Sequence, residues 1–519
     1  MRLLVTALWL TVFCNGLWAS DSVVTVSGGQ VRGQVLADGI TVFKGVPYAS
    51  APVGKLRWHA PMPVVPWSGV RDAVEYGAPC AQRDSGWNHN SASIASEDCL
   101  FVNVWNAGGS GPTLKPVMVY IHGGGNSGGS SLGLGGIEPS FDGADLARNG
   151  VVVATINYRL GVFGFFAHPE LTQESPNHSS GNYALLDQIA ALGWVRDNIR
   201  QFGGDPDNVT IFGQSAGAHD IGLLMTSPLA AGLYHKAIAE SGTVVIDGRL
   251  TPTLHDMEIS ATVIASNMGA PAEHQIEFLR GLPAQAVIDG TPRRRSGFPM
   301  GPEPIIDGYV IPELPATVFI DGKESAVPLL IGNTARERRL ADTADAAAAV
   351  REFYGPLAQR AMDIYDFDAK APTTGADSPQ GDARALWATD TNFRCGAVMV
   401  AGLHRNIAPT WEYEFSHAYE PRGAAHSWEL RYVFGNLLED SSLPADQAVS
   451  AQTQAYWTNF ARTGNPNGAS LPAWSQLDAA GSYLDIVTDG AVARKGLRRE
   501  ACALFEEKIR AETAGEHPD

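Results

Sequence analysis

The chain has 519 residues, of which 45% are hydrophobic and 18% are charged. This composition is typical of a globular protein with a large core, and it excludes a disordered or collagen-like chain. The formal net charge is -18, from 37 basic and 55 acidic residues. Binding to nucleic acid phosphates requires a basic surface, so nucleic acid is not an expected partner.

The N-terminus has the pattern of a secretion signal. Arg2 supplies a positive charge, an apolar run follows from Leu3 to Cys14, and Leu17-Trp18-Ala19 precedes a polar start. The apolar run is too short to span a bilayer, so no membrane span is expected. We expect residues 1–19 to be a cleaved signal peptide and residues 20–519 to form a single domain. The mature protein is then secreted or periplasmic.

The cysteines fit export. Of the five cysteines, Cys14 leaves with the signal, and Cys80, Cys99, Cys395 and Cys502 remain. An even number in an oxidising compartment favours two disulfides, with three connectivities open. No Cys-x-x-Cys or cysteine–histidine spacing indicates zinc, so we expect no metal and no other cofactor.

The central third of the chain alternates predicted strands and helices. Apolar runs at Val117–Ile121 and Val151–Ile156 predict two strands, and Val209–Phe212 predicts a third. Between the second and the third, apolar residues recur at helical spacing from about Tyr183 to Arg200. This order indicates a mostly parallel sheet covered on both faces, which is the α/β class.

A candidate nucleophile follows the third strand, in Gly213-Gln214-Ser215-Ala216-Gly217. In a nucleophile elbow, a serine occupies a sharp turn between a strand and a helix, and flanking glycines avoid collisions with neighbouring backbone. The segment Ala216–Leu224 supplies the predicted helix. Gly125-Asn126-Ser127-Gly128-Gly129 fits the same pattern, but no helix-forming segment follows Ser127. We therefore predict Ser215 as the nucleophile.

A serine that transfers acyl groups needs backbone N–H groups directed at the developing oxyanion. His122-Gly123-Gly124-Gly125 directly follows the first predicted strand, and its glycines allow a close approach of the backbone. We expect the N–H groups of Gly124, Gly125 and Ala216 to form the oxyanion hole.

In enzymes built around such an elbow, an acid and then a histidine follow the nucleophile in the chain. Glu337 lies in the loop after a predicted strand at Val327–Ile331, and His426 lies in the loop after another at Trp411–Phe415. Spacing alone leaves three rival bases, which are His219, His404 and His417.

Longer stretches resemble the type-B carboxylesterases, the cholinesterase-like branch of the α/β-hydrolases. The run FGGDPDNVTIFGQSAG at Phe202–Gly217 resembles the serine signature of that family, and EDCLFVNV at Glu97–Val104 resembles its second signature. Further similar stretches span nearly the whole mature chain, at Phe43–Ala49, Leu186–Ile199, Tyr432–Leu437 and Tyr456–Gly468. The resemblance implies an α/β-hydrolase fold, a large mostly parallel sheet flanked by helices.

The resemblance also implies a function and a site. Ser215 would be the nucleophile, Glu337 the acid and His426 the base of a serine esterase that hydrolyses small-molecule esters through an acyl-enzyme. It implies the disulfides Cys80–Cys99 and Cys395–Cys502 as well. The glycine loop maps onto the oxyanion hole of the family.

This chain departs from the family pattern at several positions. Asn126 stands where an aromatic residue often follows the glycine loop, and arginines flank Glu337 where aspartate and glycine are usual. Gln214 precedes the nucleophile where cholinesterases have glutamate. The loss of that negative charge disfavours choline esters.

By the same resemblance, Phe298 and Met300 are candidates for the acyl pocket and Trp87 for the wall of the active-site gorge. The arginines at Arg293–Arg295 and Arg336–Arg339 are candidates for binding a substrate carboxylate by forked hydrogen bonds. The substrate would then be an ester of a polycarboxylic acid, of the fumonisin type, and Arg336 is the first arginine to test.

Two other functions remain open. An amidase or peptidase can use the same three residues, and neuroligin-like adhesion proteins keep the fold without a working triad. The presence of all three predicted residues favours catalysis.

Overall fold

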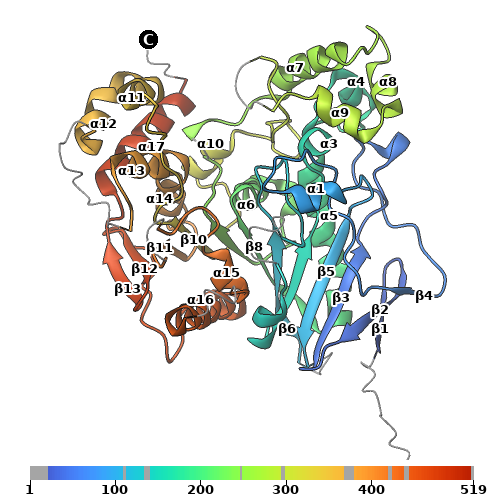
Figure 1. The fold of residues 1–519 in the computed structure, drawn as a ribbon, viewed down its shortest axis with the longest axis horizontal. Coiled ribbons are helices and arrows are strands. Elements are labelled where there is room, and N and C mark those ends of the chain that lie inside the picture. Colours follow the sequence, from blue (N-terminus) through green and yellow to red (C-terminus); the bar gives the residue numbers. More distant parts are fainter. Residues whose placement is uncertain are drawn as a thin grey trace, which may run out of the picture.

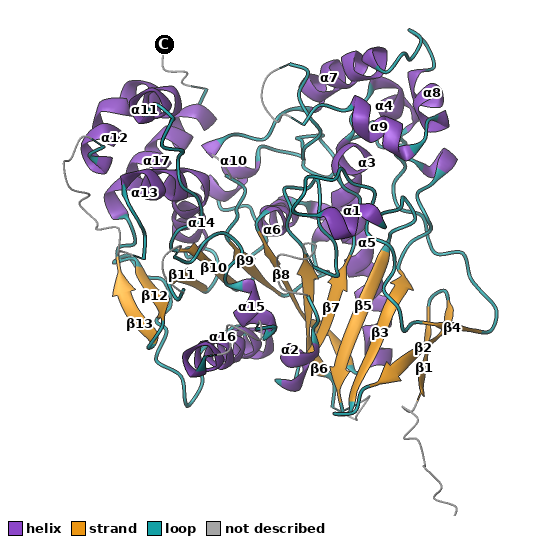
Figure 2. Ribbon diagram, in the orientation of Figure 1, coloured by secondary structure: helices purple, strands orange, loops and turns teal. Residues whose placement is uncertain are grey.

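The computed structural model describes residues 21–108, 113–133, 141–245, 248–293, 298–367, 379–418, 423–437 and 443–515. The expected signal peptide and the candidates Arg294 and Arg295 lie outside the described residues. Within the described part, thirteen strands form one sheet with helices on both faces (Figures 1 and 2). The predicted α/β class is confirmed.

The sheet has a parallel centre and antiparallel edges. All neighbours from β7 to β12 are parallel, whereas β1, β2, β3, β5 and β7 pair antiparallel at one edge and β12 and β13 at the other. In spatial order the strands are β1 (Asp21–Val26), β2 (Gly29–Val35), β3 (Ile40–Pro47), β5 (Phe101–Ala107), β7 (Val152–Ile156), β6 (Lys115–Ile121), β8 (Gly204–Gln214), β9 (Lys236–Glu240), β10 (Leu329–Thr334), β11 (Thr410–Phe415), β12 (Ser482–Val487) and β13 (Gly490–Lys495), with β4 (Val70–Asp72) paired to β2.

The helices form three groups according to the core that they cover. The first core receives side chains from α5 (Tyr183–Asn198), α6 (Ala216–Thr226), α10 (Pro315–Ile320), α11 (Ala346–Tyr354), α12 (Ala358–Tyr365), α13 (Ala383–Thr389), α14 (Cys395–His404) and α17 (Arg499–Thr513). The opposite core receives them from α2 (Ala144–Arg148), α15 (Leu430–Phe434) and α16 (Pro444–Thr463). Smaller apolar clusters receive side chains from α3 (Gly161–Phe165), α4 (Pro169–Glu174), α7 (Leu254–Asn267), α8 (Gln275–Gly281) and α9 (Ala284–Gly290). Figure 1 shows α1 (His89–Ser93) close to α3 and α9.

Strand β6 explains why the central strands are apolar throughout. Val117, Val119 and Ile121 enter the core that contains α5 and α6, whereas Met118 and Tyr120 enter the core that contains α15 and α16. Successive side chains of a strand point to opposite faces, and here both faces are covered. The apolar run that predicted this strand is therefore the signature of a strand buried on both sides.

Strand β8 is longer than predicted. It begins at Gly204 rather than Val209, and it includes Pro206. The pairing of β6 with β8 shifts its register between Lys115 and Val117, and a residue without an N–H group is tolerated at such an irregularity. The far end of β8 lies at the carboxyl edge of the parallel strands, where α/β proteins bind ligands.

Both disulfides implied by the family resemblance are present. Cys80–Cys99 closes a short loop, and Cys395–Cys502 links α14 to α17. Among the helices of the described residues, none has both the length and the apolar character that a membrane crossing requires.

Candidate active site

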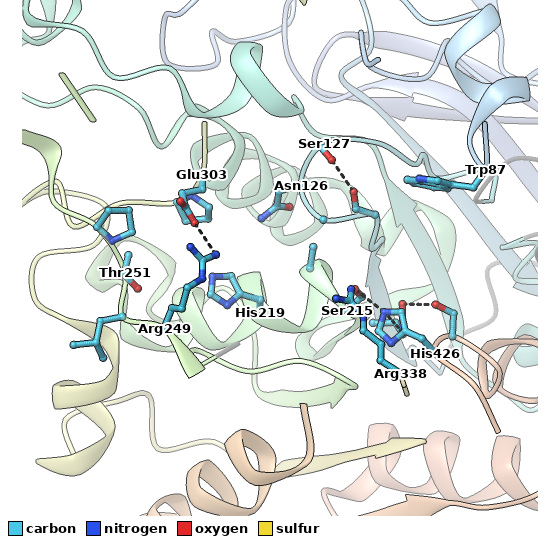
Figure 3. A pocket seen from close by; sticks show the side chains of 18 residues that line it. Trp87, Asn126, Ser127, Ser215, His219, Arg249, Thr251, Glu303, Arg338 and His426 are labelled. Carbon is cyan, nitrogen blue, oxygen red and sulfur yellow. Dashed lines mark hydrogen bonds and ion pairs between the residues drawn. The ribbon is translucent and has the colours of Figure 1, made fainter. Parts of the chain in front are cut away.

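Ser215 occupies the turn between β8 and α6, as the sequence predicts. Its backbone has φ 58° and ψ -121°, a conformation that residues with a side chain rarely adopt and that clusters at active sites. Its N–H group donates a 2.8 Å hydrogen bond to the carbonyl of Glu240 on β9. The turn places the Ser215 side chain in the wall of a cavity, beside His426 (Figure 3).

The glycines around Ser215 are required by close packing. A Cβ atom on Gly217 would lie 2.0 Å from the carbonyl oxygen of Ile121, and one on Gly213 would lie 2.6 Å from the same atom. Both distances are far inside van der Waals contact. Only glycine therefore lets the start of α6 approach the end of β6 this closely.

Three predicted residues from distant parts of the chain meet at this edge. His426 Nε2 is 2.9 Å from Ser215 Oγ, and His426 Nδ1 is 2.5 Å from Glu337 Oε2. Glu337 follows β10 and is buried, whereas the His426 side chain is 23% exposed. The imidazole is thus held by a carboxylate on one side and reaches the serine hydroxyl on the other.

The rival histidines have different surroundings. His404 is buried against Glu324, and His417 is buried against Asp446, each at 2.8 Å. His219 lines the same cavity as the predicted nucleophile but lies on α6, one helical turn further along. Neither His404 nor His417 is among the described residues of the cavity wall, whereas His426 contacts Ser215.

The glycine loop after β6 borders the same cavity. Gly124 and Gly125 line it together with Ala216, the first residue of α6. The backbone of Gly124 has φ 112°, and a Cβ atom there would lie 2.0 Å from the carbonyl oxygen of Gly128. The first N–H groups of a helix have no partner within the helix, so the Ala216 N–H is available to a ligand.

Asn126, which departs from the family pattern, links this loop to α6 by a hydrogen bond. Its side chain is buried and donates a 2.8 Å hydrogen bond to Asp220. Gln188 on α5 donates a 2.6 Å hydrogen bond to the other oxygen of the same carboxylate. The Tyr158 hydroxyl donates to the carbonyl of His122 at 2.5 Å. These bonds hold the loop in place without an aromatic residue at this position.

The cavity has a volume of about 360 Å³. Two arginines belong to its wall, Arg249 and Arg338, and Arg249 lies 3.7 Å from the carboxylate of Glu303 (Figure 3). The wall is formed by Trp87, Gly124, Gly125, Asn126, Ser127, Gln214, Ser215, Ala216, His219, Arg249, Leu250, Thr251, Pro252, Glu303, Pro304, Arg338, His426 and Ser427. The segments around residues 250 and 303 carry no sequence motif, and the sequence alone did not identify them.

Of the residues expected to contact substrate, some line the cavity and others do not. Trp87 lines the cavity, whereas Phe298, Met300 and Arg336 are not among the described residues that form its wall. The Phe298 side chain is 67% exposed, and Met300 packs against a small apolar cluster around Met257. These two residues therefore lie outside the wall of the cavity that contains Ser215, and their role in an acyl pocket stays a prediction.

Burial and hydrogen bonds act in opposite directions on Glu337. Burial favours its neutral form, but the nearby His426 and hydrogen bonds from His426, Ser241 and the Thr334 N–H outweigh it, so its pKa lies below the usual value. The Thr334 N–H is 2.7 Å from Glu337 Oε1. A carboxylate that stays ionised is what an acid partner needs to orient an imidazole and stabilise its cation.

A second buried acid lies behind this pair. Ser241 Oγ is 3.0 Å from Glu429 Oε1, and Glu429 is fully buried. Burial, together with the negative charges of Glu337 and Glu240, raises the pKa of Glu429 well above its usual value. Burial also raises the pKa of Glu240, to about 8, although Trp457 donates a hydrogen bond to it.

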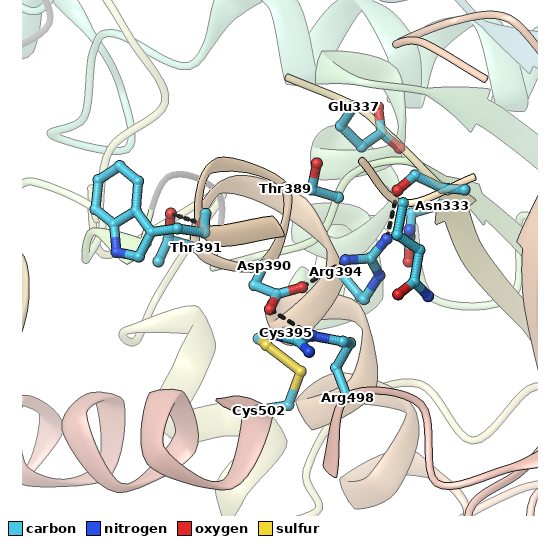
Figure 4. A network of polar contacts seen from close by, with 12 residues as sticks. Asn333, Glu337, Thr389, Asp390, Thr391, Arg394, Cys395, Arg498 and Cys502 are labelled. Carbon is cyan, nitrogen blue, oxygen red and sulfur yellow. Dashed lines mark hydrogen bonds and ion pairs between the residues drawn. A yellow bond between two sulfur atoms is a disulfide. The ribbon is translucent and has the colours of Figure 1, made fainter. Parts of the chain in front are cut away.

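A buried ion-pair network supports the loop that carries Glu337 (Figure 4). Arg394 is fully buried, pairs with Asp390 and Glu414, and donates a 2.7 Å hydrogen bond to the carbonyl of Ala335. Asp390 also pairs with Arg498 at 2.9 Å, next to the Cys395–Cys502 disulfide. Asp390 and Arg394 are the first and last residues of a π-helical turn, η6 (Asp390–Arg394), a rare form that often occurs at functional sites.

In the described residues, no group of three or more His, Cys, Asp or Glu side chains is arranged to hold a metal ion. The contacts of Ser215, His426 and Glu337 are suited to proton transfer and nucleophilic attack. A parallel sheet with a serine elbow, and with a histidine and an acid on later loops, defines an α/β-hydrolase.

Comparisons with known proteins identify the family. The model of the carboxylesterase family matches residues 20–505. Fumonisin B1 esterase of Sphingopyxis macrogoltabida is 35% identical over 88% of this chain and 84% of its own length. Para-nitrobenzyl esterase of Bacillus subtilis (strain 168) is 36% identical, over 88% and 93%. A solved structure of PNB esterase matches with TM-score 0.78 at 32% identity, covering 94% of this chain and all of that one. The chain belongs to the carboxylesterase family and is a carboxylic-ester hydrolase.

Proposed function

We propose that the protein hydrolyses carboxylic esters through an acyl-enzyme on Ser215, with His426 as the base and Glu337 as the acid that orients it. The observation that carries this proposal is the pair of contacts made by His426, 2.9 Å to Ser215 Oγ and 2.5 Å to Glu337 Oε2. This is the arrangement that serine hydrolases use on several unrelated folds.

In the proposed reaction, His426 takes the proton of Ser215 as Oγ attacks the ester carbonyl. The N–H groups of Gly124, Gly125 and Ala216 stabilise the oxyanion of the tetrahedral intermediate. The imidazolium then gives its proton to the departing alkoxide, and Glu337 stabilises the cation while it exists. Water attacks the acyl-enzyme by the same route and releases the acid.

The test is hydrolysis of 4-nitrophenyl esters of graded chain length by the wild type and by Ser215→Ala. Removal of the nucleophile is expected to lower kcat by about 10⁵- to 10⁶-fold, as in other serine hydrolases. Ser127→Ala is the matched control, because Ser127 lies in the same cavity wall within the competing Gly-x-Ser-x-Gly pattern. Undiminished turnover by Ser215→Ala would contradict the proposal.

The same assay separates an esterase from an amidase. Matching 4-nitroanilides present the same acyl groups with a poorer leaving group. We expect turnover of the esters and little turnover of the anilides. Comparable kcat/KM values on both series would favour the amidase.

We propose esters of polycarboxylic acids as a narrower class of substrate. One relative carries the name fumonisin B1 esterase, and an arginine next to Glu337 belongs to the cavity wall. This arginine is Arg338, whereas the expectation from sequence was Arg336. A panel of mono- and polycarboxylic esters tests the class.

We also infer that residues 1–19 are removed on export and that residues 20–519 act as one catalytic domain outside the cytoplasm. The two disulfides support this inference, because such bonds persist in oxidising compartments. N-terminal sequencing of the protein recovered from periplasm and medium tests it.

A further inference from the structure

The arginines next to Glu337 have different environments, although they are adjacent in sequence. Arg339 forms ion pairs with Asp382 at 2.7 Å and with Asp342 at 2.8 Å, so its charge is already compensated. Arg336 packs against Gly381, where a Cβ atom would lie 2.8 Å from Arg336 Nε. Neither of these two arginines belongs to the wall of the cavity among the described residues.

Arg338 is the arginine that faces the active site. It is exposed, it lines the cavity that contains Ser215, and Figure 3 shows it near His426. Its guanidinium lies 5.2 Å from the centre of the Phe393 ring, and that ring lies 4.6 Å from the imidazole of His426. Phe393 thus holds the cation next to the base. Within the described residues, no acidic side chain forms an ion pair with Arg338.

The charges in the cavity wall leave this cation uncompensated. Arg249 lies opposite Glu303 at 3.7 Å, so these two charges offset each other. Gln214, which stands next to the nucleophile, is neutral. The chain as a whole carries a net charge of -18 and repels anions at long range. A cavity that keeps one positive charge in such a protein is suited to an anionic group.

We propose that Arg338 binds a carboxylate carried by the substrate, so that the enzyme prefers anionic esters over neutral esters of the same shape. This inference rests on the proposed function of the same site and adds a residue and a substrate charge to it. A planar guanidinium donates two parallel N–H···O hydrogen bonds to a carboxylate, which gives orientation as well as affinity.

Because Arg338 lies beside His426, two parts of an ester substrate could carry the carboxylate to it. The leaving oxygen must come within hydrogen-bond distance of His426 Nε2 to receive its proton. The alcohol part of the ester therefore lies on the Arg338 side of the cavity, and a short diacid chain can also fold towards it. A carboxylate on the alcohol part and one on the acid part have the same chemistry, and two pairs of substrates distinguish between these positions.

The test compares charged and neutral esters of matched shape. Mono-4-nitrophenyl adipate against 4-nitrophenyl hexanoate places the carboxylate on the acid part, and 4-acetoxybenzoate against its methyl ester places it on the alcohol part. For Arg338→Gln, we expect the charged-to-neutral ratio of kcat/KM to fall about tenfold in at least one pair, mainly through KM. This is the size expected when one charge-assisted hydrogen bond at a partly exposed site is lost.

Two variants make the result specific. Arg338→Lys keeps the charge but loses the fork, so part of the ratio is expected to return. Arg339→Gln removes the neighbouring charge, which is paired outside the cavity, and is expected to leave the ratio at the wild-type value. An unchanged ratio in Arg338→Gln for both pairs, or an equal fall in Arg339→Gln, overturns the inference. Absence of turnover on every ester would instead overturn the proposed function.

Discussion

Glu337 and Glu429 are two buried carboxyl groups on either side of Ser241, and their pKa values move in opposite directions. Glu337 receives hydrogen bonds from His426, Ser241 and the Thr334 N–H, and its pKa is lowered despite burial. Glu429 is equally buried, and burial, reinforced by the negative charge of Glu337, raises its pKa. Burial alone therefore does not decide the charge of an acid, because its donors and neighbouring charges do.

The difference gives the two acids different tasks. The Ser241 hydroxyl donates to Glu429 when that carboxyl is ionised. Below its raised pKa, Glu429 is protonated and can instead donate to Ser241 Oγ, and the Ser241 hydroxyl can then donate to Glu337. A hydroxyl has only one proton to donate, so this direction is the one that serves both carboxyl groups. The neutral acid then helps to keep its ionised neighbour in place, which is how environments assign two roles to one residue type.

Among substitutions of these buried acids and of Ser241, Glu337→Gln is expected to have the largest effect. The amide keeps the shape but removes the charge that stabilises the His426 imidazolium and selects its tautomer. We expect kcat for a 4-nitrophenyl ester to fall by about 10³- to 10⁴-fold. Steady-state kinetics together with a circular dichroism melt distinguish this loss from unfolding. A loss below tenfold would show that another acid supports the imidazole.

The second-largest effect is expected from removal of the Ser241 hydroxyl, which lies between the two acids. Ser241→Ala takes a donor from Glu337, so the pKa of Glu337 rises towards its usual value. We expect kcat to fall by about tenfold, in line with one lost hydrogen bond to a charged group. The acid limb of the profile of kcat/KM against pH is also expected to move to higher pH. If that limb stays where it is in the wild type, Ser241 is not a donor to Glu337.

Glu240 is a third buried acid, next to these two. The variant Glu240→Gln tests, through the free energy of unfolding, whether Glu240 is neutral in the folded protein. Burial raises the pKa of Glu240 to about 8 in the folded protein, whereas the unfolded chain returns this carboxyl to its ordinary pKa of about 4.5. Between these values the folded state holds one more proton, so this group lowers stability as pH rises. Glutamine stays neutral and its oxygen can accept the Trp457 N–H. We expect the difference in the free energy of unfolding between the Glu240→Gln variant and the wild type to rise by about 1 kcal/mol per pH unit from pH 5 to pH 8.

Urea unfolding at pH 5, 6.5 and 8 measures this difference. The slope is the informative quantity, since a constant offset reflects packing alone. A difference that does not change with pH would mean that Glu240 is ionised in the folded protein.

The smallest effect is expected from Glu429→Gln. The amide is neutral like the protonated acid, and its N–H group can donate to Ser241 in the same way. We expect kcat/KM to fall by less than about threefold, within the range of substitutions that keep shape and hydrogen bonding. Comparison with Glu337→Gln under the same conditions makes the contrast direct. A loss as large as that of Glu337→Gln would mean that Glu429 is charged.

Local patterns predicted the fold to within a few residues. The strand expected at Val327–Ile331 appears as Leu329–Thr334, after Pro328, which has no N–H group for the sheet. The helix expected at Tyr183–Arg200 ends at Asn198 and continues as a tighter turn, η2 (Ile199–Phe202). Periodicity reports which residues are apolar, but the ends of elements depend on hydrogen bonds that no local pattern contains.

Motif, chain order and family resemblance agree on the α/β class and on the elbow at Ser215, and they predict Glu337 and His426 as its partners, without any knowledge of the packing. Packing in three dimensions sets which arginine faces the cavity, places Phe298 and Met300 outside its wall, and moves the pKa values of Glu337 and Glu429 in opposite directions. Exposure and charge depend on neighbours from β9, β10 and the loops after β10 and β11, such as Ser241 and Glu429, which are 188 positions apart in the chain. These neighbours are set by packing rather than by adjacent sequence.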